Sequence, residues 1–422
     1  MKRKLSVCNK YVLALVFSFI SILTVRGAEK SPELKTGQWR ATIERPDGQR
    51  IVFNFETKDS AGKQIIYVIN GSEKLLVDSI ETRLDSVFIQ MPFFESSFKA
   101  KISANGNLDG IWIKNYGNIT QVLPFTAEYN NKERFKVSSE PVANISGRWP
   151  ADFVAKDGSV STIVAEFKQN GSHLSGTFLD PTGDYRFLYG VVTGDSLKLS
   201  TFDGAHAFLF TAKIENANKI TGGKFYSGAR SIQEWSAVKN ESATLDNGFD
   251  EVKLNPAAGK LNFSFRNSDD GKMVSINDDE YKNKVVVIQI MGSWCPNCMD
   301  ETKFLSEYYK KNKDKGVEVI GLAYERTTDF ERSQKDLVPF KKRFHVEYPV
   351  LITGVTVSDS LRAEKTLPQL KKIEAFPTTI FVDKKGNIRK IHSGFNGPAT
   401  GSHFTEYKDE FNKFVAMLLA EK

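Results

Sequence analysis

The sequence predicts a multidomain protein in which two repeated antiparallel β domains, barrels or sandwiches, precede an α/β domain. Up to about residue 240, short runs of branched and aromatic residues alternate with turn signals, which is typical of antiparallel β structure. After residue 260, strand-like runs alternate with helical stretches. A chain of 422 residues is also too long for a single hydrophobic core. The predicted division is 1–28 (signal peptide), 29–140 and 141–240 (β domains), 241–260 (linker) and 261–422 (α/β domain).

The segment 1–28 has the layout of a secretory signal peptide. A basic opening precedes the apolar residues 11–25, and the small residues Gly27 and Ala28 follow. The apolar run is shorter than the roughly 20 residues of a membrane-spanning helix. We therefore expect export to the periplasm or cell envelope, with an uncleaved anchor as the alternative. Five of the positive charges lie in this segment, so the net charge of +7 falls to about +2 without it, and nucleic-acid binding is not indicated.

Residues 37–240 contain an internal repeat. Gly37-Gln38-Trp39 matches Gly147-Arg148-Trp149 at one end, and Phe125-Thr126-Ala127 matches Trp235-Ser236-Ala237 at the other. Both pairs share one offset along the chain, because the differences 147 − 37 and 235 − 125 are equal. A shared offset at both ends predicts a duplicated domain, and strands at this spacing suggest small barrels or sandwiches.

The β region lacks an obvious catalytic constellation, since no paired acids, nucleophile with a base, or metal cluster stand out in its sequence. One interpretation is a spacer or dimerisation module. The other is a lipocalin-like pocket that holds a ligand or docks a partner. The aromatic candidates for such a cavity or contact surface are Phe93, Phe94, Tyr185, Phe187 and Tyr189.

The predicted reactive centre is the run of residues 294–298, Trp-Cys-Pro-Asn-Cys. Residues 284–291 predict a buried strand, and residues 297–315 predict a helix because they contain no Gly or Pro. Cys295 then lies where the strand gives way to the helix, and free amide groups and the helix dipole stabilise a thiolate at such a position. Pro296 suits the first helical turn.

Two alternatives for this cysteine pair are a zinc site and a structural disulfide. Tetrahedral zinc needs four nitrogen or sulfur ligands, but the sequence has no second CxxC and no spaced pair of histidines. Cys8 precedes the apolar run of the predicted signal peptide. A disulfide that closes so short a loop removes little entropy from the unfolded chain. We therefore predict thiol redox chemistry, with no metal and no other cofactor.

Residues from about 260 to 422 resemble the exported TlpA/ResA-like thiol–disulfide oxidoreductases of the thioredoxin fold. The shared marks are Trp294-Cys295-x-x-Cys298, the Phe376-Pro377-Thr378 run before a late strand, and the Asp-Lys-Lys-Gly hairpin of residues 383–386. The resemblance does not extend to residues 29–250.

The resemblance implies a role for each marked residue. Cys295 would be the attacking thiolate, and Cys298 the deeper, resolving cysteine that attacks the mixed disulfide. Pro377 would be the family's cis-proline beside the disulfide. Trp294, Pro296 and Phe376 would contact an extended substrate that pairs with the backbone at Phe376.

Two departures from the thioredoxin pattern are informative. Thioredoxins proper place a buried aspartate six residues before the first cysteine, where this chain has Gln289. The resembled group instead has a glutamate after the following strand, where Glu325 stands, and a partly buried carboxylate there would accept the Cys298 proton. The alternative is a solvated Glu325 paired with Arg326. The long stretch of residues 353–375 is expected to form a wall of the substrate groove.

The leading hypothesis is an exported reductase of protein disulfides, which the resemblance implies is kept reduced by a membrane electron donor. An oxidase or isomerase is the alternative within the same chemistry. A peroxidase of the peroxiredoxin type is less favoured, because Gly292 stands where that site has a threonine. A binding protein whose β repeats carry the main function is the alternative outside enzymes.

Overall fold

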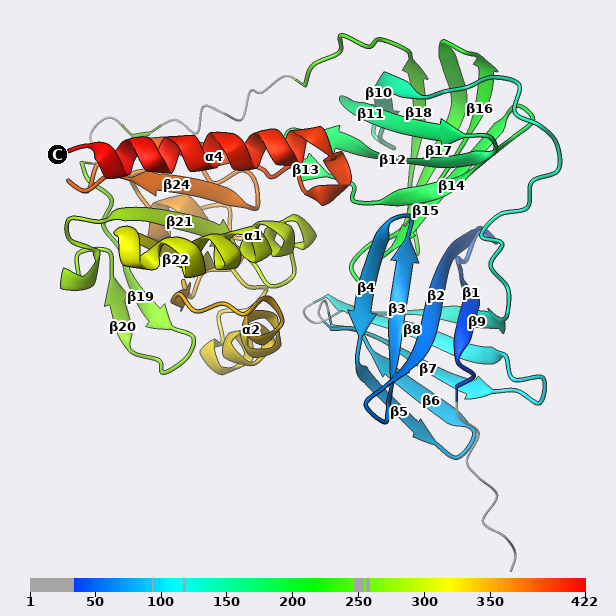
Figure 1. Ribbon diagram of the computed structural model, residues 1–422, viewed down its shortest axis with the longest axis horizontal. Helices are drawn as coiled ribbons and strands as arrows, with labels where there is room; N and C mark the ends of the chain where they lie inside the picture. The colour runs from blue at the N-terminus through cyan, green and yellow to red at the C-terminus, as the bar shows by residue number, and fades with distance from the viewer. Residues whose placement is uncertain (1–33, 93–94, 117–118, 246–253, 256–258) are drawn as a thin grey trace, which may run out of the picture.

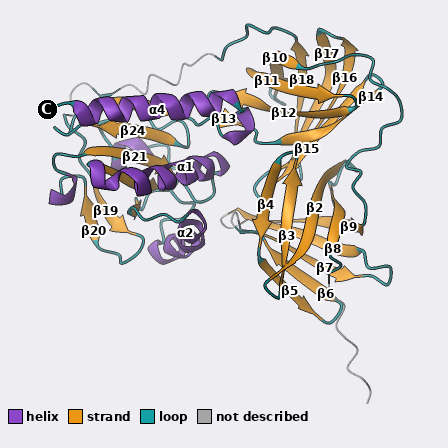
Figure 2. Cartoon of the chain, viewed as in Figure 1, coloured by secondary structure: helices purple, strands orange, loops and turns teal. Residues whose placement is uncertain are grey.

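Residues 34–92, 95–116, 119–245, 254–255 and 259–422 are described by the computed structural model. The predicted signal peptide lies outside the described residues, as do Phe93, Phe94 and part of the predicted linker. Within the described residues, no helix is long and apolar enough to cross a membrane. The chain forms a first β lobe (residues 34–129), a second β lobe (residues 147–238) and a C-terminal lobe (residues 259–422) that carries the helices (Figures 1 and 2).

The first β lobe is one nine-stranded antiparallel sheet with the order β4-β3-β2-β1-β9-β8-β7-β6-β5. Trp39, Ala41 and Ile43 alternate inward along its first strand, as the two-residue period of a strand requires. Trp112 and Phe125 complete the centre of the core. The strands are β1 (Gly37–Glu44), β2 (Arg50–Ser60), β3 (Lys63–Asn70), β4 (Glu73–Val77), β5 (Ser79–Arg83), β6 (Ser86–Gln90), β7 (Ser96–Ile102), β8 (Leu108–Tyr116) and β9 (Ile119–Tyr129).

The second β lobe is also a nine-stranded sheet, and its additional pairing between β11 and β12 closes it into a barrel. Its interior is filled by stacked and edge-on rings, among them Phe153, Phe178 and Phe210. Tyr185 packs among them, 5.7 Å from the Phe225 ring. The strands are β10 (Gly147–Val154), β11 (Val160–Asn170), β12 (His173–Asp180), β13 (Gly183–Asp184), β14 (Leu188–Thr193), β15 (Ser196–Phe202), β16 (Ala207–Asn216), β17 (Lys219–Ser227) and β18 (Ser231–Val238).

The two β lobes share the register of their first and last strands. Gly37 pairs with Thr57 in the first lobe, and Gly147 pairs with Phe167 in the second. The closing strands repeat this, with Ala41 opposite Ala127 and Ala151 opposite Ala237. Every partner is thus shifted along the chain by the same offset that separates Gly37 from Gly147. The β11–β12 pairing of the second lobe repeats the β2–β3 pairing of the first, and the lobes differ in closure because the second lobe also pairs β12 with β14.

The C-terminal lobe has a seven-stranded sheet with the order β20-β19-β23-β22-β21-β24-β25 and helices packed against it, which is a thioredoxin fold. Its central strand β21 is buried at every position, as its branched sequence predicts. The predicted opening and closing hairpins are confirmed as β19–β20 and β24–β25. The strands are β19 (Ser264–Asn267), β20 (Met273–Ser275), β21 (Val285–Met291), β22 (Val317–Ala323), β23 (Val350–Ile352), β24 (Thr378–Val382) and β25 (Ile388–Ser393).

Alternate residues of β21 face two separate hydrophobic cores. Val285 and Val287 face one core together with the helices α1 (Pro296–Asn312), α2 (Phe330–Phe344) and α4 (Ser402–Ala420). Val286 and Ile288 face the other, which includes α3 (Arg362–Thr366) and the apolar side chains that follow it. Residues 353–375, expected to be a groove wall, therefore contribute Ala363, Leu367, Leu370 and Ile373 to this second core.

Candidate active site

The cysteine pair lies at the junction of β21 and α1, as the sequence predicts. Cys295 is the N-cap of α1, and its Sγ accepts a hydrogen bond from the backbone N–H of Cys298 at 3.2 Å. The two cysteines form a disulfide. Cys298 is completely buried, whereas Cys295 keeps 4% of its surface exposed. This asymmetry fits an outer cysteine that meets substrate and a deeper cysteine that resolves the mixed disulfide.

The late proline lies beside the disulfide. The Phe376–Pro377 peptide bond is cis, as expected, and the Phe376 carbonyl oxygen lies 3.4 Å from Cys295 Sγ. Trp294 packs on Phe376 with ring centroids 5.3 Å apart, and its indole N–H donates to the Tyr324 carbonyl at 2.8 Å. Segments that are distant in sequence thus meet at one sulfur atom.

Glu325 follows β22 and is buried, with 3% of its surface exposed. Its carboxylate accepts the backbone N–H of Ser293 at 2.9 Å and the Ser293 hydroxyl at 2.7 Å. Burial raises the pKa of Glu325 to about 7 in spite of these hydrogen bonds. The alternative of a solvated glutamate is wrong, and the guanidinium of Arg326 lies instead over the rings of Tyr116 and Trp294.

A second buried acid, Glu301, was missed by the sequence reasoning. It lies one helical turn after Cys298 and is completely buried. Its carboxylate accepts hydrogen bonds from the Gln289 amide at 2.9 Å, the Tyr407 hydroxyl at 3.1 Å and the Thr379 hydroxyl. Burial raises the pKa of Glu301 to about 7.

Gln289 joins this acid to the deeper cysteine. Its side-chain amide donates to Glu301 and also to the carbonyl oxygen of Cys298 at 3.3 Å, while the Thr302 hydroxyl donates to its Oε1 at 2.9 Å. Position 289 has no carboxylate, in contrast to the aspartate of thioredoxins, but Glu301 on the facing helix α1 places a carboxylate next to it. The signal was in the sequence, because helical spacing from Cys298 to the buried Leu305 passes through Glu301 and Thr302.

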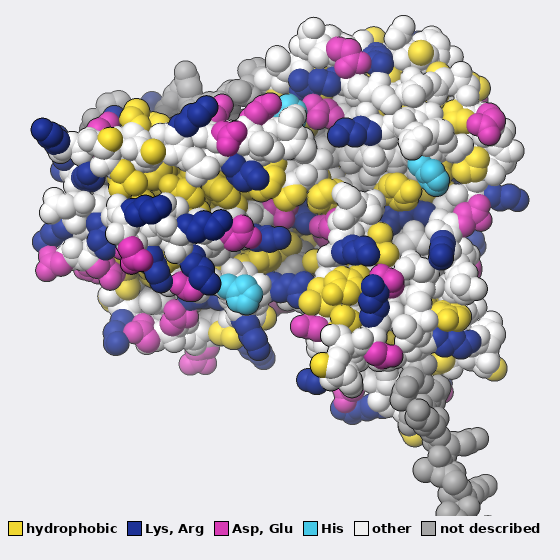
Figure 3. Space-filling view, viewed as in Figure 1, with side chains coloured by type: hydrophobic (Ala, Val, Ile, Leu, Met, Phe, Trp, Pro, Cys, Tyr) yellow, Lys and Arg dark blue, Asp and Glu magenta, His cyan; other side chains and the backbone are white. Residues whose placement is uncertain are grey.

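A pocket of about 260 Å³ lies beside the motif, between the C-terminal lobe and the first β lobe. Ser293, Trp294 and Glu325 form part of one wall, and Met91 and Lys114 form part of the other. On the face of the molecule drawn in Figure 3, Lys and Arg side chains are interspersed with Asp and Glu over the described residues. Within the described residues, no group of three or more His, Cys, Asp or Glu side chains is arranged to hold a metal ion.

The Redoxin family matches residues 257–408. The thiol-disulfide oxidoreductase ResA of Bacillus thuringiensis subsp. konkukian is 28% identical over 138 residues, which is 33% of this chain and 68% of that protein. ResA of Halalkalibacterium halodurans is 30% identical over 122 residues, 28% of this chain and 60% of that protein. A solved thiol:disulfide interchange protein of the thioredoxin family from Chlorobium tepidum is 20% identical, covers 40% of this chain and 98% of its own, and has a TM-score of 0.30.

The matching sequences and the cysteine pair at the head of α1 define a thiol–disulfide oxidoreductase. Its C-terminal lobe matches the Redoxin family and is similar to ResA/TlpA-like proteins of the thioredoxin fold.

Proposed function

We propose that this chain is an exported reductase of protein disulfides that works through the Cys295–Cys298 pair. The observation that carries the proposal is the position of Cys295, which caps α1 and lies 3.4 Å from the carbonyl oxygen beside Pro377. The free amides of the first turn stabilise a thiolate at this place. An extended substrate strand would lie against Trp294, Pro296 and Phe376.

The reaction balances as two exchanges at sulfur. In the reduced dithiol form, the Cys295 thiolate attacks one sulfur of the substrate disulfide, and the other substrate sulfur leaves as a thiolate. Cys298 then loses its proton and attacks Cys295 Sγ, which releases the second substrate thiolate and leaves the enzyme disulfide. Two electrons pass to the substrate. A membrane electron donor would return the enzyme to the dithiol form.

We propose that the two buried carboxylates, Glu301 and Glu325, accept the proton that Cys298 loses before it attacks Cys295. Glu301 lies one turn further along α1 and is joined to the Cys298 carbonyl through Gln289. The Glu325 carboxylate is hydrogen-bonded to Ser293, which precedes Cys295 by two residues. Burial raises the pKa of both acids to about 7, so each can take up and release a proton near neutral pH.

We also propose that the two β lobes arose by duplication and that the N-terminal segment 1–28 directs export. The shared offset in strand register supports a duplication that produced the domains at residues 29–140 and 141–240. The layout of the segment 1–28 supports export. A mature chain recovered from the cell envelope should therefore begin near residue 28 or 29, and a chain that stays in the cytoplasm would contradict export.

The direct test is reduction of insulin by the full chain in the presence of dithiothreitol. The wild type should accelerate insulin precipitation, and Cys295→Ser should not, because the attacking thiolate is gone. In Cys298→Ser the mixed disulfide cannot be resolved, so substrate proteins should remain bound to Cys295. The proposed reductase is contradicted if the wild type does not accelerate insulin precipitation and no substrate protein remains trapped on Cys298→Ser.

A further inference from the structure

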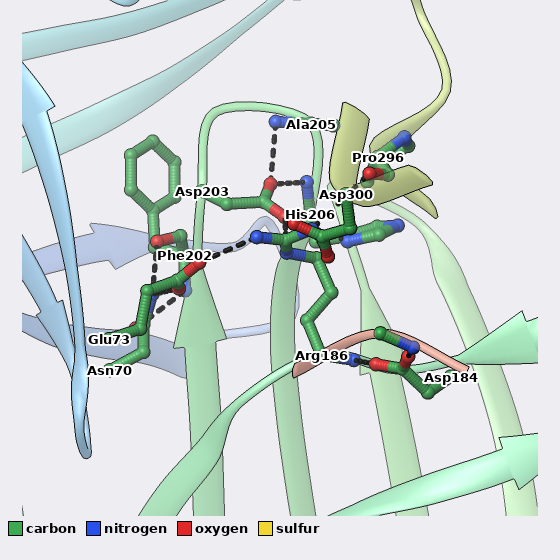
Figure 4. Close-up of polar contacts among 11 residues, drawn as sticks. Asn70, Glu73, Asp184, Arg186, Phe202, Asp203, Ala205, His206, Pro296 and Asp300 are labelled. Carbon is green, nitrogen blue, oxygen red and sulfur yellow. Dashed lines mark hydrogen bonds and ion pairs between the residues drawn. The ribbon is translucent and has the colours of Figure 1, made fainter. Parts of the chain in front are cut away.

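Arg186 of the second β lobe contacts the redox helix directly. It lies between β13 and β14 and is buried, with 4% of its surface exposed. Its guanidinium donates to the Pro296 carbonyl at 3.3 Å and to the Asp300 carboxylate at 2.6 Å, so both contacts fall in or next to the first turn of α1 (Figure 4).

The same guanidinium binds carboxylates from both β lobes. It pairs with Glu73 of β4 at 2.6 Å and with Asp203, just after β15, at 3.2 Å. One buried cation thus joins the three lobes at the start of α1 (Figure 4). Removal of such a cation leaves these carboxylates without the positive charge that they share, which opposes close packing of the lobes.

The turn between β15 and β16, residues 203–206, lies beside the motif, because Ala205 lines the same pocket as Ser293 and Trp294. Asp203 holds the turn by accepting the backbone N–H groups of Ala205 at 2.9 Å and His206 at 2.6 Å, together with a 3.0 Å contact to His206 Nδ1. Ala205 packs against the hydrophobic cluster that contains both cysteines, and its carbonyl accepts from Lys114 of the first β lobe.

A second group of contacts joins the second β lobe to the motif and to the segment after β25. Gly183 forms a backbone bridge with Phe395, which follows β25, and the Asp184 carboxylate accepts the Gly397 N–H at 2.7 Å. The side-chain amide of Asn297, between the two cysteines, lies 3.3 Å from both the backbone N and O of Asp184. Gly183 has φ +148° and no room for a Cβ against this amide.

We propose that the turn of residues 203–206, held by Arg186, is a cap that determines which substrates reach Cys295. While the cap is closed, small thiols and disulfides reach Cys295 through the 4% of its surface that is exposed. Folded proteins react with Cys295 only when the lobes separate. The inference rests on the proposed function in one respect, that Cys295 is the residue that meets substrate. Arg186 is a positioning residue, since it acts through the cap.

The test compares a small and a bulky thiol reagent on Cys295. In the full chain carrying Cys8→Ser and Cys298→Ser, Cys295 is the sole cysteine. The rates at which iodoacetamide and a polyethylene glycol maleimide alkylate Cys295 are measured in the native chain and in urea. The ratio of the maleimide rate to the iodoacetamide rate should be at least about tenfold lower in the native chain than in urea, and Arg186→Ala should restore most of this difference.

Arg45→Ala is the matched control. The Arg45 side chain is also fully buried and paired with Asp47, and it joins the two β lobes at Gly228, away from the cysteines. The control should leave the ratio unchanged. If Arg186→Ala does not fold by circular dichroism, Asp300→Ala removes one of the same contacts from the α1 side and should raise the ratio in the same direction.

The outcomes separate the cap from the reductase. The cap is contradicted if the bulky reagent labels the native parent as fast, relative to iodoacetamide, as it labels the unfolded chain. It is also contradicted if the Arg186 and Asp300 variants match the Arg45 control. A rise in the ratio on loss of Arg186, with insulin left unreduced by chains that keep both cysteines, would support the cap and contradict the reductase.

Discussion

Replacement of Glu301 by glutamine should remove a pH-dependent loss of stability from the C-terminal lobe. The carboxyl group is completely buried, and its pKa rises from 4.5 to about 7 on folding. A raised pKa means that the folded state favours the protonated acid. The stability that protonated Glu301 contributes is therefore fully present below pH 4.5 and is lost as the pH rises to about 7. The difference between the two pKa values corresponds to about 3 kcal/mol of folding free energy.

The glutamine is neutral throughout this range and can keep the neighbouring hydrogen bonds. Hydroxyl groups of Thr379 and Tyr407 can donate or accept, and the Gln289 amide can turn to match the new side chain. We expect Glu301→Gln to be within about 1 kcal/mol of wild type near pH 4.5 and about 3 kcal/mol more stable near pH 7.5. The comparison uses the oxidised protein, in which the cysteines do not titrate.

Hydrogen exchange of the β21 and α1 peptides measures this lobe separately from the β lobes. Exchange in wild type and variant is compared at each pH, so the intrinsic pH dependence of exchange cancels. Glu307→Gln, at a position on the same helix that is not buried, is the control and should follow wild type. If Glu301→Gln and wild type keep a constant difference from pH 4.5 to 7.5, burial does not raise the Glu301 pKa and its assignment as a proton acceptor loses its basis.

Three further predictions concern catalysis and packing. Glu301→Gln should slow resolution of the mixed disulfide by about a hundredfold in single-turnover assays, the size expected for loss of a general base, and an unchanged rate would exclude it from that role. Glu325→Gln should remove an ionisation near pH 7 from the pH profile of insulin reduction, because burial raises the Glu325 pKa to about 7, whereas a profile that keeps this ionisation would assign it elsewhere. Ile288→Ala, at a completely buried position of β21, should cost about 2–5 kcal/mol of stability in urea unfolding, and a loss below about 1 kcal/mol would mean that the site collapses around the cavity.

The parts of the site that follow from local sequence were predictable. The branched run of β21 and the unbroken helical stretch after it placed Cys295 at a helix N-terminus without any tertiary information. Pro377 and Glu325 came from resemblance, because their nearness to the cysteines depends on how distant strands align. Glu301 was visible only as a helical position, and its importance appears once Gln289 and Tyr407 are seen to face it.

The contacts between lobes could not be predicted from this single sequence. Glu73, Arg186, Asp203 and Asp300 come from four separate segments, and each reads alone as a charged residue of a solvated turn, strand or helix. Only the packing of three lobes turns them into one buried cluster. The stretch of residues 353–375 shows the same difficulty, since its composition did not reveal that Leu367 and Leu370 would join the core beneath the sheet.

The buried cluster also bears on how the redox lobe should be studied. The carboxylate partners of Arg186 stabilise its guanidinium away from water, and those partners are divided among all three lobes. Excision of the C-terminal lobe would remove Arg186 from Asp300 and Ala205 from the hydrophobic cluster that contains both cysteines. Its cysteine would then meet substrates that the intact chain excludes, so only the full chain can show which disulfides the enzyme selects.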